Sequence, residues 1–350
     1  MATGHPDLPP PAAQSVIDKT ALFAALLELD RDDAARGRIL RMETDFRRKA
    51  DIHIGGLTSN RATFARFNTN PFVLLLYAKE RGYAAVHEIE RDIAPAKLFS
   101  SMETSAGKIV EEVTLPVYGW EQVNSEMHSV HSKIDGRRTS IDNSTYDVVS
   151  LKSGPRCLND DSAKGIGADI AENLTNWGME TGAKKIVFTL GVLYGTKNQS
   201  NKKDWHVIRN LAEGLSKHAK IISSHKGNWG IEFELNKVNC SARVRIGREW
   251  WSYLGGSNWT FLEVCVALIR ACVLVKPTIP TSSPFMIGDL PRIVDTACIQ
   301  SDYNISLLQR SQYEWLLFAA RHFCDRFSDD GSGLRKRARP KQMIQPDKKP

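Results

Sequence analysis

The sequence predicts an α/β (α+β) protein in which helices flank a mixed central sheet. Lys185 to Tyr194 contains the apolar run IVFTLGVLY, whose length is that of a buried central strand. Residues 160–178 carry apolar side chains at helical spacing, and 230–235 and 242–246 alternate as two strands do. Segments of both kinds follow one another along the chain, which favours helices packed on a sheet.

The first part of the chain is expected to be helical. Residues 1–14 are proline-rich, so we expect a disordered arm, and residues 15–94 form a helical N-terminal region. Cap and stop residues set the expected helices: one begins at Ser15, one runs from Asn70-Pro71 to Gly82, and one begins near Pro95-Ala96.

The rest of the chain forms the expected core, 95–328, with further helices at 205–215, 258–275 and 304–327. The last segment, 329–350, is basic and low in apolar residues, so it is expected to be a disordered tail. Residues 331–350 hold seven Lys/Arg and one Asp, or +6 of the formal net charge of +7. The body is therefore nearly neutral, and a DNA footprint on it must be local.

The composition excludes several classes of protein. The six cysteines form no C-x-x-C pair, which argues against structural zinc, and they are expected to be reduced core thiols. No apolar run reaches the length of a membrane span, and the N-terminus does not read as a signal peptide. We therefore expect a cytoplasmic protein.

The most informative stretch is a predicted β-hairpin. Residues 132–136 are expected to form a short strand, the turn surrounds Gly136-Arg137-Arg138, and the second strand lies within 146–155. Side chains alternate along a strand, so Ser150 and Lys152 share a face that Asp135 can reach. A carboxylate that holds a divalent cation, with a lysine that orients a water, suits metal-assisted phosphodiester hydrolysis.

These residues resemble the PD-(D/E)XK nuclease signature. The stretch Leu151-Lys152-Ser153-Gly154-Pro155, with Asn159-Asp160 after it, is similar to one group of type II restriction endonucleases. Two later stretches, LYGTK at 193–197 and GREWWSYLGG at 247–256, fit the same group, so the resemblance covers roughly residues 95–275. Ser150 departs from the pattern, since an acid usually stands there.

The resemblance implies a metal site and its ligands. Asp135 and Lys152 would be catalytic together with Ser150, and Mg²⁺ would be the cofactor. A glutamate from the preceding helix, Glu111 or Glu112, would help to bind the metal, as would the backbone carbonyl of Leu151. Some relatives move the missing carboxylate to the next helix, where the acids are Asp160, Asp161, Asp169 and Glu172; Asp160-Asp161-Ser162 also reads as a helix N-cap.

Asp142 and Asp147 compete with Asp135 for the metal. Asp147 lies an odd number of residues before Lys152, so in a regular strand it faces away. Asp142 would need the hairpin turn to be shifted. We therefore rank Asp135 first, Asp142 second and Asp147 third. His128 and His131 do not suit a zinc site and are taken as structural or DNA-contacting.

Three polar, basic stretches are candidates for contact with DNA, because Arg, Lys, Asn and Gln read base edges in the major groove. They contain Arg137, Arg138, Lys197, Asn198, Gln199, Lys202, Lys203, Lys226 and Asn228. The pair Trp250-Trp251 is expected in the core.

The resemblance implies Mg²⁺-dependent, sequence-specific cleavage of double-stranded DNA that leaves 5′-phosphate ends. A palindromic site implies a homodimer, and a companion DNA methyltransferase is expected. The alternatives are another nuclease of the superfamily, for repair or junction resolution, and a non-catalytic DNA-binding protein.

Overall fold

The computed structural model describes residues 12–59, 71–123, 134–215, 219–225, 229–273, 288–299 and 303–328. Within these residues a seven-stranded sheet has the order β2-β3-β4-β5-β8-β7-β6. Its strands are β2 (Glu121–Gln122), β3 (Gly136–Thr139), β4 (Thr145–Lys152), β5 (Lys185–Val192), β6 (Lys220–His225), β7 (Gly230–Leu235) and β8 (Val238–Ile246).

The middle of the sheet is parallel. β5 pairs in parallel with β4 on one side and β8 on the other, while the remaining pairs are antiparallel. β5 is buried from its second residue to its last, which confirms the predicted central strand. Lys152 lies opposite Val192, and Val192 lies opposite Ile246, so the three strands end at the same side of the sheet.

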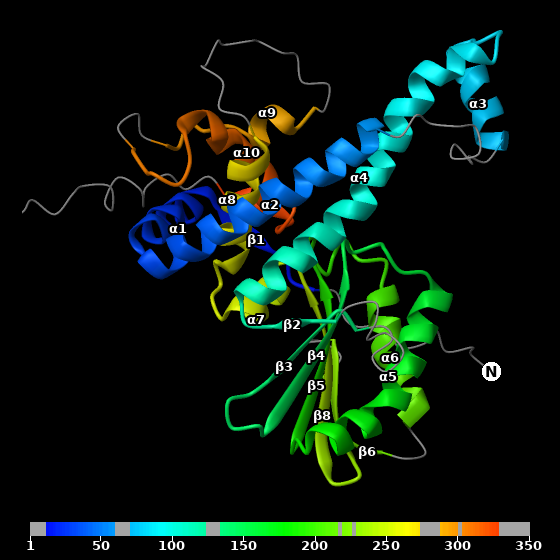
Figure 1. Cartoon of the computed structure of the whole chain (residues 1–350), viewed down its shortest axis with the longest axis vertical. Helices are drawn as coiled ribbons and strands as arrows, with labels where there is room; N and C mark the ends of the chain where they lie inside the picture. The colour runs from blue at the N-terminus through cyan, green and yellow to red at the C-terminus, as the bar shows by residue number, and fades with distance from the viewer. Residues whose placement is uncertain are drawn as a thin grey trace, which may run out of the picture.

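Two helices, α5 (Asp160–Thr181) and α6 (Lys203–Leu215), lie side by side on one face of the sheet (Figure 1). The predicted stripe of α5, which includes Ile166, Ile170 and Trp177, joins a core cluster with strand residues such as Val148. Asn159 caps α5 by accepting a hydrogen bond from the Ser162 N–H at 2.8 Å. The expected cap at Asp160 to Ser162 is therefore one residue too late.

A helical layer packs at the carboxyl end of the parallel strands. It contains α1 (Lys19–Arg31), α2 (Asp33–Ser59), α4 (His87–Val117), α7 (Arg248–Gly255), α8 (Thr260–Cys272), α9 (Leu290–Ile293), the 3₁₀ turn η4 (Arg310–Gln312) and α10 (Tyr313–Arg321). The long helices α2 and α4 cross and contact each other, and α3 (Pro71–Arg81) lies at the end of α4 that is remote from the sheet (Figure 1). Trp250 and Trp251 are buried in the core of this layer, as expected.

Several boundaries differ from the expectations. Val16–Asp18 forms strand β1, which pairs in parallel with β9 (Arg326–Ser328), so Asp18 rather than Ser15 caps α1. α4 begins at His87 and continues past position 95 instead of starting there. The helix expected at 304–327 is only α10 with η4 before it, and β6 and α7 were not predicted.

The hairpin turn was also predicted wrongly. Gly136 to Thr139 are strand β3, and the turn is at Ser140 to Ser144. Arg137 and Arg138 therefore lie in a strand, and Asp142 lies in the turn. The reason is physical: Gly136 fits against Leu115 and Val149, where a Cβ would come within 3.0 Å of the leucine, so this glycine serves packing rather than a turn.

All six cysteines are free thiols. Cys240, Cys265 and Cys324 are buried as expected, whereas Cys157 and Cys272 are exposed, so the core placement was wrong for those two. None of the described helices combines the length and apolarity needed to cross a bilayer. The 1–11 part of the proline-rich arm and the 329–350 tail lie outside the described residues.

Candidate active site

Asp135 and Lys152 are brought together by neighbouring strands. Lys152 is the last residue of β4, and Asp135 directly precedes β3, the antiparallel partner of β4. The Asp135 N–H donates to the Val149 carbonyl at 2.7 Å, and its carboxylate accepts the Leu151 N–H at 2.5 Å. Both side chains are half-buried. The predicted association of this carboxylate with the strand of Lys152 is therefore present.

Glu111 of α4 completes the cluster. Its carboxyl group is desolvated, and burial followed by repulsion from Asp135 raises its pKa to about 8, while Lys152 opposes the rise. Two carboxylates and a lysine from three separate elements thus act on one another. Paired acids that repel in a desolvated place are typical of sites that take up a cation.

A helix glycine allows α4 to approach the sheet. Gly107 lies one turn before Glu111, and a Cβ at that position would be 3.0 Å from the Cβ of Ser153. Ser153 directly follows Lys152, so the close contact of α4 with this segment places Glu111 over the end of β4. This contact was not predicted, although a glycine inside a helix is a sequence signal of close packing.

Glu112, the other candidate glutamate, is held by lysines. Lys49 of α2 donates to its carboxylate, and Lys108 lies 3.8 Å away on α4. These contacts tie α4 to α2. The geometry therefore favours Glu111 as the metal ligand of the pair.

The rival aspartates have structural partners. Asp142 accepts hydrogen bonds from Ser140 and Ser144 in the hairpin turn, which lower its pKa to about 2. Asp147 contacts Arg138 at 3.1 Å and the Tyr253 hydroxyl at 2.9 Å. Tyr253 belongs to α7 on the opposite face from α5, so the prediction that Asp147 faces away from Lys152 is confirmed.

Ser150 is fully buried, and its hydroxyl has no hydrogen-bond partner among the described residues. It lies between Val148 and Lys152 on the face that α5 covers. Among the described residues, this hydroxyl therefore makes no hydrogen bond that would stabilise the fold. The acid that the resemblance predicts at this position has no direct substitute on β4.

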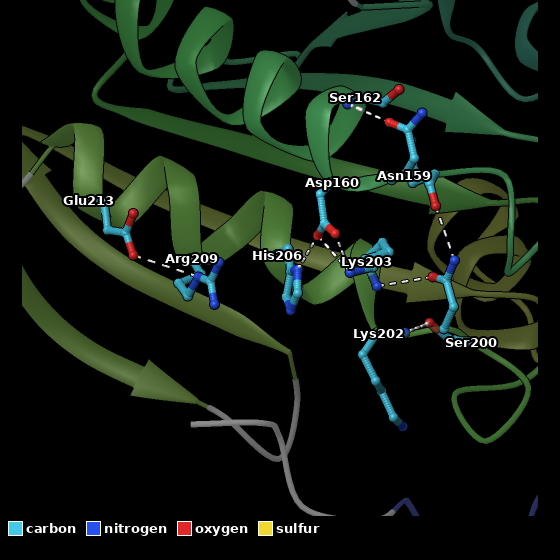
Figure 2. Close-up of polar contacts among 11 residues, drawn as sticks. Asn159, Asp160, Ser162, Ser200, Lys202, Lys203, His206, Arg209 and Glu213 are labelled. Carbon is cyan, nitrogen blue, oxygen red and sulfur yellow. Dashed lines mark hydrogen bonds and ion pairs between the residues drawn. The ribbon is translucent and has the colours of Figure 1, made fainter. Parts of the chain in front are cut away.

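The acids of α5 differ in their contacts. Asp160 accepts two hydrogen bonds of 2.6 Å from Lys203 and lies 3.1 Å from the His206 ring, which links α5 to α6 (Figure 2). These partners hold its pKa below the usual range. Asp161 and Glu172 are exposed and Asp169 is half-buried. The groups that act most strongly on Glu111 include none of these four acids.

The side chains expected to contact DNA mostly have internal partners. Arg137 pairs with Glu121 at 2.7 Å and Arg138 with Asp147, while Lys203 pairs with Asp160. Lys226 and Asn228 lie outside the described residues, as do His128 and His131.

The loop after β5 is also tied to the protein. Lys197 pairs with Glu249 at 2.7 Å, Asn198 donates to Asp325 at 2.8 Å, and Gln199 accepts the Thr196 N–H at 3.0 Å. Lys202 donates to the Lys197 carbonyl and lies over the Trp229 ring. This loop therefore offers DNA fewer free groups than its composition indicates.

The comparison with known families decides the identity. Residues 68–224 match the family model described as Type II restriction endonuclease EcoO109I. The chain is a type II restriction endonuclease. Such an enzyme is a site-specific deoxyribonuclease, and its family is part of the PD-(D/E)XK superfamily, as the motifs predicted. No curated protein matches the sequence.

The matched range of this restriction endonuclease contains the whole cluster of Glu111, Asp135 and Lys152. It begins before the predicted resemblance at 95 and ends at 224, within β6. The GREWWSYLGG stretch, which is α7 with one flanking glycine at each end, lies beyond it. Among the described residues no group of three His, Cys, Asp or Glu side chains is arranged to hold a metal.

Proposed function

We propose that this restriction endonuclease cleaves double-stranded DNA at a specific sequence in an Mg²⁺-dependent reaction that leaves 5′-phosphate ends. The observation that carries the proposal is the convergence of Glu111, Asp135 and Lys152 from α4, the β3 entry and β4. Each residue type has a role in phosphodiester hydrolysis.

The donor set fits Mg²⁺. The ion prefers oxygen ligands and usually takes one or two protein carboxylates while it keeps several waters. Glu111 and Asp135 supply two such groups, and the Leu151 carbonyl could add a third oxygen. The ion would neutralise charge on the phosphate and lower the pKa of a bound water. Glu112 stays a weaker candidate because Lys49 already holds it, and Asp161 is a candidate for the carboxylate that Ser150 lacks.

Lys152 would orient the attacking water beside the phosphate. Its ammonium group is half-buried, and its influence reaches the Glu111 carboxyl group. Asp135 is oriented by the Leu151 N–H, on the strand that carries this lysine. The Ser150 hydroxyl, which is buried without a partner among the described residues, would bind a water in the same region.

DNA would be contacted by the basic side chains around this cluster. We propose Arg137, Arg138 and the 197–203 loop as contacts that become available when DNA competes for their present partners, and we propose Lys226 and Asn228 as further contacts. Surface ion pairs such as Arg137–Glu121 are worth about 1 kcal/mol or less, so exchange for a phosphate is feasible.

A homodimer would match the two-fold symmetry of a palindromic site. Exposed apolar side chains on α3 support an interface there: Phe72, Val73, Leu75 and Leu76. Patches of this kind often mark contacts between proteins. Sedimentation of the wild type and of the L75E/L76E variant tests the proposed dimer. A wild-type protein that stays monomeric at high concentration, even when it is bound to its DNA site, would contradict it.

The deciding experiment is the digestion of a phage genome. Discrete bands in Mg²⁺, absent in EDTA, are expected from site-specific cleavage. A smear would favour another nuclease of the superfamily, and binding without any cleavage would favour a non-catalytic DNA-binding protein. A DNA methyltransferase gene beside this one would fit a cytoplasmic restriction–modification pair.

A further inference from the structure

A cleft of about 510 Å³ opens beside α7, away from the catalytic cluster. Its walls are Ser15, Arg245, Arg248, Glu249, Ser252, Tyr253 and Asn258. Arg245 lies opposite Gly191 in the sheet, and Gly191 faces Trp250 of α7. The cleft is therefore on the face of the sheet that α5 and α6 leave uncovered.

Two arginines in this cleft have no hydrogen-bond acceptor among the described residues. Arg245 lies over the Tyr253 ring at 4.2 Å, and Arg248 lies 5.8 Å from the Trp259 and Phe261 ring centres. Neither side chain makes a hydrogen bond or ion pair with the described residues, and the Nε of Arg245 is buried without a partner.

The neighbouring arginine on the same strand is different. Arg243, two residues before Arg245, pairs with Glu232 at 3.1 Å. Among the described residues, the Arg243 guanidinium thus has a carboxylate partner, whereas the Arg245 guanidinium does not. Desolvation lowers the pKa of both Arg245 and Arg248, because burial disfavours their charged forms.

The acids near the cleft already have partners, and two of these partners are cations. Glu249 pairs with Lys197 at 2.7 Å, and Asp147 pairs with Arg138. Asp325, which accepts from the Ser15 N–H, also accepts hydrogen bonds from Thr196 and Asn198. The local balance is therefore positive, and an external anion would provide the missing acceptor.

We propose that Arg245 and Arg248 bind a backbone phosphate of the DNA at a distance from the scissile phosphate. A phosphodiester carries only acceptors, which matches the two guanidinium groups and the side-chain amide N–H of Asn258, whose Oδ1 accepts the Ser252 hydroxyl at 3.2 Å. β8 ends beside β5 and β4, so Arg245 lies two strands, or about 10 Å, across the same end of the sheet from Lys152, and its side chain is on the opposite face of the sheet. The inference rests on the proposed cleavage of DNA.

The test compares R245Q, R248Q and the double variant with R243Q as the matched control. Binding of a short random-sequence duplex is measured in EDTA at several salt concentrations, so cleavage is not needed. Each single variant should weaken binding by roughly tenfold, and the double variant should lower the salt slope by about 0.9 for the phosphate contact that is lost. R243Q should bind like the wild type.

Unchanged affinity in the double variant would overturn the inference. So would a loss of affinity at an unchanged salt slope, which would indicate a base contact or a distorted fold. R245M separates a structural role from binding: removal of an unpaired desolvated charge should keep or raise the melting temperature without DNA. A lower melting temperature with normal DNA affinity would make Arg245 a packing residue.

The two proposals fail in different ways. Wild type that binds the duplex but never cuts it in Mg²⁺ contradicts the proposed cleavage, and the arginine variants still decide the phosphate site. If the wild type cuts DNA and the arginine variants bind DNA as tightly as the wild type does, only the proposed phosphate site is contradicted.

Discussion

The Leu151 N–H and the Asp135 carboxylate are joined by a 2.5 Å hydrogen bond. The bond fixes one oxygen of the acid against the strand that ends in Lys152. A restriction endonuclease that positions its metal ligand in this way should depend on the charge of that ligand more than on its shape.

We predict that D135N and K152A lower Mg²⁺-dependent cleavage by roughly two orders of magnitude or more. Asn keeps an oxygen acceptor for Leu151, so the fold should be retained in D135N. Digestion assays and far-UV circular dichroism check both parts. Substantial cutting by either variant would remove that residue from the catalytic cluster.

D147N should reduce stability rather than catalysis. Asp147 accepts from the Tyr253 hydroxyl and pairs with Arg138 on the face away from Lys152. Weakening these charge-assisted bonds should cost about 1–3 kcal/mol in the free energy of unfolding. Chemical denaturation and cleavage assays are carried out on both D147N and D135N. A larger loss of cleavage in D147N than in D135N would mean that the metal ligands are misassigned.

E111Q should abolish cleavage and make the metal-free enzyme more stable at high pH. Burial and Asp135 raise the Glu111 pKa from 4.5 to about 8, so the folded state holds this proton more tightly than the unfolded state does. Its stabilising contribution is full below about pH 4.5 and is lost as the pH rises through about 8. The gain in E111Q should grow across that window, by up to about 1.4 kcal/mol for each pKa unit.

Denaturation in EDTA at several pH values measures the effect. E112Q is the matched control: it loses the contact with Lys49 and should be destabilised instead. An E111Q protein that is less stable than wild type near pH 8 would show that this carboxyl is ionised and paired.

Asp204 of α6 gives a second pH effect, remote from the cluster. It is fully buried, its Oδ1 has no partner in the described residues, and desolvation raises its pKa from 3.8 to about 6. Stability should fall as the pH rises from about 3.8 through 6, and D204N should remove that fall. D160N provides the contrast, because the lowered pKa of Asp160 makes its contribution disappear as the pH falls.

G247A should strongly destabilise the enzyme. Gly247 has φ +56°, and a Cβ there would be 2.3 Å from the Gly195 carbonyl oxygen. The backbone strain alone costs roughly 1–3 kcal/mol, and the clash adds to it. G256A is the control, with φ +76° and no atom within 4 Å of its Cβ. Equal melting temperatures for the two variants would contradict the close approach.

The central strand, α5 and the association of Asp135 with Lys152 could be predicted because they depend on local pattern. A continuous apolar run predicts β5, and a helical stripe predicts α5. The odd spacing of Asp147 predicted its opposite orientation, since strand geometry alone fixes that relation.

Other features depend on contacts that are distant in sequence. Glu111 and Glu112 are equivalent by pattern, and only the approach of Gly107 to Ser153 and of Lys49 to Glu112 separates them. The hairpin turn was misplaced because Gly136 reads as a turn residue, whereas Leu115 and Val149 require its small size. The unpaired state of Arg245 is likewise visible only once its neighbours on α7 are placed.

The parallel pair β1–β9 bears on how the polypeptide reaches its native state. It joins residues 310 positions apart, as in the Asp18–Ser328 hydrogen bond. Such a contact cannot form while the ribosome still holds the second partner, and its loop closure carries a large entropy cost. The strands and helices of the sheet can pair earlier, so docking of the segment before α1 should be a late step in folding. Amide exchange after dilution from denaturant should protect Ile17 after Phe188.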